Sequence, residues 1–313
     1  MTYRIPLPSG ARRPHLDLIE PNSTEVQRLI RRDGLAAYEP PTAAALLALC
    51  DLAGPGFVMY DVGSNMGLYS HLVASVFAPA RVVAFEPAPA TAAVSRAIGK
   101  RNGLAVDVIE AAVSDSPGSA ELFFSPISDA SNSLSSTFRH AVGSTLVDVV
   151  TIDRQVASTG LDPDVMKIDV ETFEPEVLRG ARGTLERCRP PIVIEALPRR
   201  DRYLGAEIAA EIHGLEYHCY PLTSSPTWEP VPKIHGLGTA DRDWLLLPEP
   251  ITPAMIERWQ QWGHALGEIT VDRNPRVPLM LSTRAAFGRG GASEVVASGR
   301  RYAESVLARL CSR

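Results

Sequence analysis

Short, nearly continuous apolar runs recur along the chain. They are separated by stretches in which apolar residues recur at the spacing of a helix. The runs at 57–62, 81–85, 105–109, 165–168 and 192–195 have the length of single strands and contain few polar residues. Runs of this kind are typical of parallel strands that are covered on both faces, because both sides of each strand must then be apolar. The pattern therefore predicts a parallel sheet at the centre of the molecule.

Between these runs, apolar residues recur at helical spacing, and capping residues precede several of the segments. Helices are predicted at 25–32, 42–52, 68–77, 90–101, 173–181, 203–212, 253–263 and 293–310. Further strands are expected at 119–125, 146–152, 216–220 and 243–247. Residues 1–22 show neither pattern and are expected to be a loose lead-in. Strands that alternate with helices predict an α/β fold, a Rossmann-like sheet with helices on both faces.

The first apolar run leads into a loop with two glycines that opens a helix. Gly63 and Gly67 bracket Asn65, and Asp61 lies just before them. Glycine lets the backbone of such a loop approach a ligand closely, and the loop N–H groups are expected to point outward. An adenosine-containing cofactor is a ligand that such loops hold in many α/β folds. A turn that only joins strand to helix has the same spacing, so both interpretations stay open.

A carboxylate ends the second apolar run. Glu86 lies 23 residues after Gly63 and is followed by Pro87, which forces the chain to leave the strand. An acid at this distance behind the loop is where the two hydroxyls of a ribose would be held. A solvated glutamate at a strand end is the alternative interpretation.

Three further positions are candidates for the same site. The adenine of a cofactor would lie against small apolar residues after the third strand, such as Ala112, although these residues suit a core equally well. The serine-rich segment 128–136 is either an active-site lid or a mobile surface segment. Glu39, just before two prolines, is either a contact near the cofactor or a solvated surface acid.

Four acids stand at strand ends that a parallel sheet brings to one rim. Asp61, Glu86, Asp169 and Glu195 follow apolar runs, and parallel sheets bind their ligands at this edge. Glu171 would share a face with Asp169 if the strand continued that far. A carboxylate there can act as a general base, with Asp169 as the first candidate and Glu171 and Glu195 behind it. Alternatively, Asp169 and Glu195 hold one divalent cation through their oxygens.

Composition and charge argue against several other classes of protein. The chain of 313 residues has a net charge of −5, which gives no reason to expect a nucleic-acid partner. It contains no apolar run of about 18 residues, so no membrane span is expected, and its proline-rich start is unlike a secretory signal. The four cysteines lack metal-type spacing and have the pattern of isolated thiols. A cytoplasmic protein is therefore expected.

Five motifs along the chain resemble, in order, those of the FkbM family of methyltransferases. They are DVGSNMG at 61–67, FEP at 85–87, SNSL at 131–134, TID at 151–153 and KIDVETFEPEVLRGA at 167–181. The resemblance covers roughly residues 35–200, and the last motif is the most specific. Thr172 stands where that family usually has glycine, so the turn after the fourth parallel strand is expected to be reshaped.

The resemblance implies a class I methyltransferase fold that uses S-adenosylmethionine to methylate a hydroxyl of a sugar, glycan or other natural product. S-Adenosylhomocysteine would be the product, and the acceptor would be a small molecule or a glycan. The residues expected to hold the cofactor are Asp61, Gly63, Ser64, Asn65, Gly67, Leu68, Glu86, Pro87, Ala112 and Asp169. No residue is assigned as a metal ligand.

Two other functions stay open on the residues alone. A nicotinamide-dependent oxidoreductase would carry a third glycine close behind Gly67, where the sequence has Leu68-Tyr69-Ser70. A non-catalytic relative that only binds S-adenosylmethionine would have lost the acids at the strand ends, and this chain retains all of them.

The chain divides by composition into three parts. A helical lead-in is expected at 1–56, the methyltransferase domain at 57–249, and a helical, arginine-rich extension at 250–313. The extension would contact an anionic substrate or a partner subunit of a homo-oligomer, or remain a solvated appendage.

Overall fold

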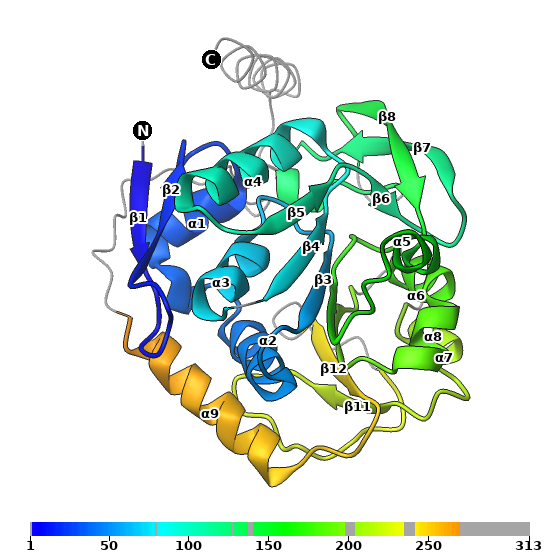
Figure 1. The fold of residues 1–313 in the computed structure, drawn as a ribbon. Helices are drawn as coiled ribbons and strands as arrows, with labels where there is room; N and C mark the ends of the chain where they lie inside the picture. The colour runs from blue at the N-terminus through cyan, green and yellow to red at the C-terminus, as the bar shows by residue number, and fades with distance from the viewer. Residues whose placement is uncertain are drawn as a thin grey trace, which may run out of the picture.

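The molecule is built around one central sheet with helices on both of its faces (Figure 1). The computed structural model describes residues 2–269 except for 79, 127, 137–139, 198–203 and 235–241. The strands of the sheet are β3 (Val58–Val62), β4 (Arg81–Phe85), β5 (Val106–Ile109), β9 (Val165–Ile168), β10 (Ile192–Glu195), β11 (His218–Pro221) and β12 (Asp243–Leu247). Among the described residues these seven strands have the order β11-β12-β10-β9-β3-β4-β5. The predicted α/β sheet is thus confirmed.

The strand order changes direction beside β3. β4 and β5 extend the sheet on one side of β3, whereas β9 and β10 lie on the other side, and all five strands are parallel. β12 adds to β10 in the antiparallel direction, and β11 pairs with the outer edge of β12. Because the chain departs in opposite directions from β3 and β9, their carboxyl ends leave a crevice between the loops that follow them.

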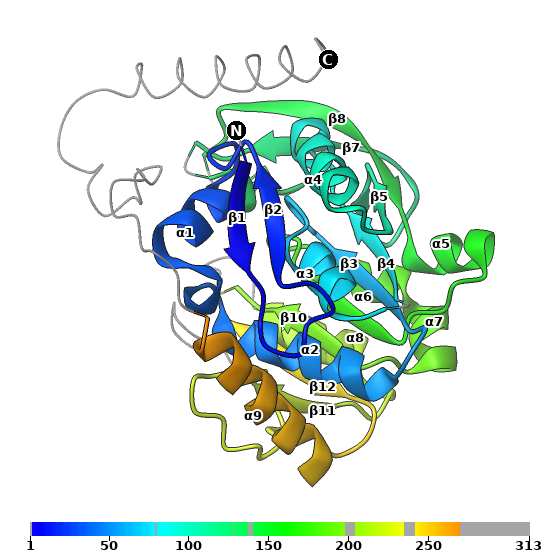
Figure 2. The ribbon, with the colours of Figure 1, turned by 60° about the vertical axis from the view of Figure 1, so that its left-hand side comes forward.

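Alternate side chains of the strands face two separate layers of helices. Met59 belongs to the core on one face and Tyr60 to the core on the other, and both are fully buried. The first layer consists of α2 (Pro40–Ala53), α3 (Leu68–Val76) and α4 (Pro89–Asn102). The second consists of α5 (Ile152–Thr159), α6 (Glu174–Gly180), α7 (Arg182–Cys188) and α8 (Leu204–Glu211). α9 (Pro253–Gly267) packs along α2 at the outside of the first layer (Figure 2).

The expected loose lead-in at 1–22 is wrong. Thr2–Pro6 (β1) and His15–Ile19 (β2) form an antiparallel hairpin, which packs against α4 and α3. Its apolar side chains alternate inward, and Leu16 and Leu18 are completely buried. The prolines around the turn break the runs that usually identify strands, which hid this alternation in the sequence. α1 (Glu25–Asp33) and the short 3-10 helix η1 (Leu35–Ala37) follow the hairpin.

A smaller sheet of three strands follows β5 in the chain. β6 (Ala112–Val113) pairs with β8 (Gly143–Val150) in the parallel direction, and β7 (Gly118–Phe124) pairs with β8 in the antiparallel direction. The connection between β7 and β8 contains the 3-10 helix η2 (Asp129–Ser131) within the serine-rich segment. The helix predicted at 293–310 lies outside the described residues.

Candidate active site

A cavity of about 260 Å³ opens at the carboxyl ends of β3, β4, β9 and β10. Its other walls come from α1, from the residues before α2 and from η2. The predicted site residues that line it are Gly63, Ser64, Asn65, Leu68, Glu86, Pro87, Ala112, Asp169, Glu171 and Glu195. Asp61 and Gly67 are not among the lining residues. Most of the candidate residues predicted from the strand ends therefore lie in one cavity.

The glycine loop satisfies its own backbone N–H groups, contrary to the expectation that they point outward. Gly63 and Ser64 both donate to the carbonyl oxygen of Phe85, at 3.0 and 2.9 Å. Asn65 donates from its backbone to Glu86 Oε2 at 2.9 Å, and the N–H of Met66 donates to the Asn65 side-chain oxygen. A phosphate would need such groups to be free. The loop is thus poorly suited to a pyrophosphate.

Both glycines of the loop are required by their surroundings beneath the cavity. Gly63 has φ +79°, and a Cβ on it would overlap the backbone carbonyl of Asp169, because the loop crosses the end of β9 at this point. Gly67 has φ +76°, and its Cβ would press on the side chains of Ser95 and His71. A side chain at Gly67 would therefore meet α3 and α4 rather than the cavity.

Asp61 supports the loop from inside the core. It is fully buried, and its Oδ2 accepts hydrogen bonds from the backbone N–H and the hydroxyl of Ser70, at 3.1 and 2.5 Å. Burial raises its pKa above the usual value. The contacts of this side chain join the end of β3 to α3.

Glu86 stands at the end of β4 with its carboxylate held by two backbone groups. Oε2 accepts from Asn65, and Oε1 accepts from the N–H of Ala88 at 2.8 Å. The side chain is nearly buried, and burial raises its pKa to about 8. Each carboxylate oxygen keeps a second lone pair, so the group can still accept from two neighbouring hydroxyls in the cavity.

The serine-rich segment forms a wall of the cavity, and Glu39 forms part of another. Asp129 accepts from the backbone N–H of Glu25 at 2.8 Å and from the Asn65 amide at 3.3 Å, which ties η2 to α1 and to the glycine loop. Ser133 donates to the carbonyl of Glu171 at 2.7 Å. Glu39 also lines the cavity, accepts from the Tyr69 hydroxyl at 2.7 Å, and is not a solvated surface acid.

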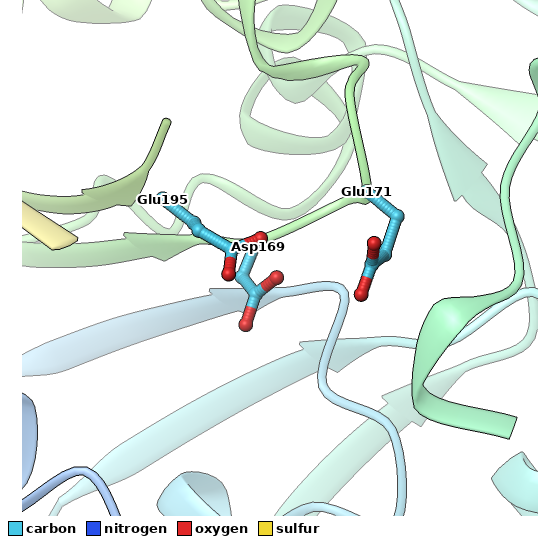
Figure 3. A group of neighbouring side chains, drawn as sticks. All are labelled: Asp169, Glu171 and Glu195. Carbon is cyan, nitrogen blue, oxygen red and sulfur yellow. The ribbon is translucent and has the colours of Figure 1, made fainter. Parts of the chain in front are cut away.

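Three carboxylates gather where β9 and β10 end (Figure 3). One oxygen each from Asp169, Glu171 and Glu195 lies within 4.8 Å of the others. The strand stops at Ile168, so Glu171 does not reach this place by strand alternation. Instead, Glu171 has φ +53° and Thr172 has φ +90°, in the region that favours glycine. The tight turn formed by these two residues brings the Glu171 carboxylate close to that of Asp169.

Glu174 stabilises this turn from below. It is fully buried and accepts from the backbone N–H groups of Val170 and Thr172, at 3.1 and 3.2 Å. Burial raises its pKa to about 7. Thr172 keeps the strained backbone conformation because the two hydrogen bonds of Glu174 fix the backbone at Val170 and at Thr172 itself.

Lys167 belongs to the site, although the sequence analysis assigned it only to a strand. Its Nζ donates to Asp169 Oδ2 at 2.9 Å and lies 5.1 Å from the centre of the Tyr69 ring. It is 4% exposed and lines the cavity. Burial alone would raise the pKa of Asp169, but the Lys167 ammonium outweighs it and lowers that pKa. A lysine inside an apolar strand was the signal for this pair.

The two carboxylate oxygens of Glu195 have different surroundings. Arg242 lies 3.3 Å from its Oε1, whereas its Oε2 is buried without a hydrogen-bond partner. Burial, together with the neighbouring Asp169 and Glu171, raises the pKa of Glu195 well above its usual range. The end of β10 therefore offers a carboxylate that takes up a proton more readily than an ordinary glutamate.

The charge of the cavity suits S-adenosylmethionine better than a dinucleotide. Among the described residues, seven acids line it, namely Glu25, Glu39, Glu86, Asp129, Asp169, Glu171 and Glu195. Of the described residues in the lining, only Lys167 and Arg242 are basic. A sulfonium carries positive charge and no phosphate, so an acidic lining attracts it and repels a pyrophosphate. The hydroxyl of Ser64, buried without a partner at the wall, is a further group that a bound ligand would satisfy.

A mostly parallel sheet of this order, with an acidic cavity at its switch point, is the architecture of class I S-adenosylmethionine-dependent methyltransferases. The sequence model of the methyltransferase FkbM domain matches residues 61–219, so the chain belongs to the FkbM family of methyltransferases. The resemblance noted in the sequence is thereby confirmed. In the described part of the chain, no helix is long and apolar enough to cross a membrane.

Individual relatives are distant. The chain is 32% identical over 137 residues to the hexuronic acid methyltransferase AglP of Haloferax volcanii, a match over 44% of this chain and 54% of AglP. It therefore spans about half the length of this curated relative. A methyltransferase FkbM structure from Methylobacillus flagellatus has 17% identity and a TM-score of 0.41, over 61% of this chain and 43% of that one. An O-methyltransferase from Bacillus cereus has 13% identity and a TM-score of 0.40, over 65% and 78%.

Proposed function

We propose that this methyltransferase acts on a hydroxyl group of a sugar, of a glycan or of a related natural product. The observation that carries the proposal is the group of three carboxylates beside the donor cavity, because an alcohol must lose its proton to be methylated. The name of AglP, a hexuronic acid methyltransferase, supports a carbohydrate acceptor. S-Adenosylmethionine supplies an electrophilic methyl group, so the protein has mainly to align and deprotonate the acceptor.

The donor would lie along the cavity from β4 to β9. Glu86 would accept hydrogen bonds from both ribose hydroxyls, and Ser64 would offer its unpartnered hydroxyl nearby. Ala112, with Leu122 and Leu134, would supply an apolar surface against which the adenine ring lies. Asp61 and Gly67 would contribute indirectly by shaping the glycine loop.

The acceptor hydroxyl would meet the carboxylates at the other end of the cavity. Lys167 keeps Asp169 ionised, so Asp169 would accept the hydrogen bond of the hydroxyl and orient its oxygen toward the donor. Glu195, with its raised pKa, is the carboxylate in this group best matched to take up the proton. Glu171 would complete the wall from the turn after β9.

An acceptor screen tests this proposal. The protein is incubated with isotopically labelled S-adenosylmethionine and a panel of hexoses, hexuronic acids and glycans, and transfer is read by mass spectrometry. We expect an acceptor-dependent product whose label survives mild alkali, because a methyl ether is stable there and a methyl ester is not. Transfer only to a carboxyl group, or to no member of the panel, would contradict the proposed hydroxyl acceptor.

Replacing Glu86 with alanine should weaken donor binding without changing the fold. The loss of a charge-assisted contact to two ribose hydroxyls costs about 2–3 kcal/mol, or roughly 30- to 150-fold in affinity. Calorimetry with S-adenosylhomocysteine measures this change. Glu121→Ala, which removes an exposed glutamate of β7 outside the cavity lining, is the control and should bind like the wild type. Equal affinity of both variants would rule out the ribose role.

Donor affinity should also rise with pH. Burial raises the pKa of Glu86 to about 8, so below pH 8 most molecules carry a protonated Glu86 that must lose its proton before it accepts from two hydroxyls. Affinity should therefore increase by up to about tenfold per unit between pH 6 and 8 and level off above pH 8. Calorimetry across this range measures the profile. The Glu86→Ala variant should lose this slope, and an unchanged slope would assign the titration to another group.

A further inference from the structure

The three carboxylates at the ends of β9 and β10 lie close enough together to share one ligand. Lys167 is paired with Asp169 at 2.9 Å, and Arg242 reaches only Oε1 of Glu195, at 3.3 Å. Among the described residues lining the cavity these are the only two bases, and the same cavity also holds Glu39. Such a group of acids attracts a cation.

Glu195 provides an independent sign that a ligand is required there. Its side chain is 6% exposed, and its Oε2 is buried without any hydrogen-bond partner, although the cavity lies beside it. Leaving a carboxyl oxygen buried and unpartnered costs roughly 1–3 kcal/mol, and more when the group is ionised. A bound ion would give this oxygen the partner that the protein does not provide.

The spacing of the oxygens suits one ion. They lie within 4.8 Å of one another. Two ligands on opposite sides of Mg²⁺ are about 4.2 Å apart, and on the larger Ca²⁺ about 4.6–5.2 Å. We propose that Asp169, Glu171 and Glu195 together bind one hard divalent cation, which prefers oxygen ligands, and that the carboxylates draw together slightly around an ion as small as Mg²⁺ or Mn²⁺. Asp169 would bind through the oxygen that does not face Lys167.

A bound ion would change the chemical role of the three side chains. With the cation bound, all three carboxylates stay ionised and act as ligands, and an acceptor oxygen that joins the ion has its own pKa lowered. The inference deepens the proposed function because it concerns the same cavity. Ion binding itself requires neither the donor nor the acceptor, so it can be measured separately.

Electron paramagnetic resonance of Mn²⁺ tests the site on the full chain. The protein is stripped with a chelator and titrated with Mn²⁺ alone, and the free-ion signal reports binding. We expect saturable binding of one Mn²⁺ per chain, which Mg²⁺ displaces. Glu195→Gln should weaken it at least about tenfold, since even outer-shell substitutions cost 10- to 100-fold. Should that variant fail to fold, Glu171→Gln, on the less buried turn, serves as the second test.

The matched control is Glu39→Gln, which removes a carboxylate from the same cavity but outside the three ligands. It should bind Mn²⁺ within about threefold of the wild type, because the substitution removes none of the three ligand oxygens. Absence of one-to-one binding in the wild type would overturn the inference. So would an equal loss in Glu39→Gln and Glu195→Gln, because general negative charge would then explain the attraction.

The outcomes separate this inference from the proposed function. Mn²⁺ binding without methyl transfer to any sugar hydroxyl would support the cation site and contradict the acceptor. Methyl transfer that is indifferent to the chelator, in a protein that binds no Mn²⁺, would support the acceptor and contradict the cation site.

Discussion

Alanine at Gly63 is expected to destabilise the protein by more than about 3 kcal/mol, the range of substitutions that combine backbone strain with a steric clash. The new Cβ would overlap the carbonyl of Asp169, and neither backbone segment can move without breaking the pairing of β3 with β9. The residue would also have to adopt φ +79°. Urea unfolding followed by circular dichroism measures the loss.

Gly56→Ala is the matched control for this substitution. Gly56 has φ +86° but nothing lies within 4 Å of the position of a Cβ, so it carries the conformational cost without the clash. It should lose only about 1 kcal/mol. Equal losses at the two glycines would show that the loop and the end of β9 are not packed as described.

Asp169→Asn is expected to reduce turnover at least about 100-fold while donor affinity stays within a few-fold of the wild type. Asparagine keeps an oxygen that can accept from Lys167, so the turn should survive. What is lost is the negative charge facing the acceptor, whether that charge orients the hydroxyl or binds an ion. Steady-state kinetics on a verified acceptor and calorimetry with S-adenosylhomocysteine measure the two effects.

A strand-end acid outside the cavity provides the control for Asp169→Asn. Glu110 follows β5 directly, pairs with Arg96 at the surface and does not line the cavity. Glu110→Gln should therefore retain wild-type turnover. If Asp169→Asn turned over at the same rate, Asp169 would have no catalytic role, and Glu171 or Glu195 would take its place.

The sheet and the position of the cavity followed from local patterns. The apolar runs gave β3, β4, β9 and β10 to within a residue or two, and the strand predicted at 243–247 has the bounds observed. Acids at the ends of parallel strands must meet at one edge, so Glu86, Asp169 and Glu195 could be brought together without coordinates. Such features depend on period and connectivity, which the sequence displays directly.

The contacts within the site depend on neighbours far apart in the chain. Asn65 and Gly63 use their N–H groups on Glu86 and Phe85, which no spacing rule reveals. Glu171 joins the carboxylate group through a turn with positive φ rather than through a longer strand. Lys167 is a single charged residue in an apolar run, and only its contact with Asp169 in the structure explains why it is there.

The division of the chain into three parts at 56 and 249 stays a proposal. Side chains of α2 and α9, from the first and last parts, belong to the same hydrophobic core as Met59 of the central sheet. Deletion of residues before 57 should therefore expose that core and prevent a stable fold, a result that would assign these segments to the domain itself.

A crystal structure with S-adenosylhomocysteine is the most direct measurement of the central claim, that the cavity at the ends of β3, β4 and β9 binds the methyl donor beside the three carboxylates. We expect the ribose hydroxyls on Glu86 and the sulfur directed toward Asp169. A nucleoside bound elsewhere, or bound in this cavity with its ribose away from Glu86 and its sulfur away from Asp169, would contradict it.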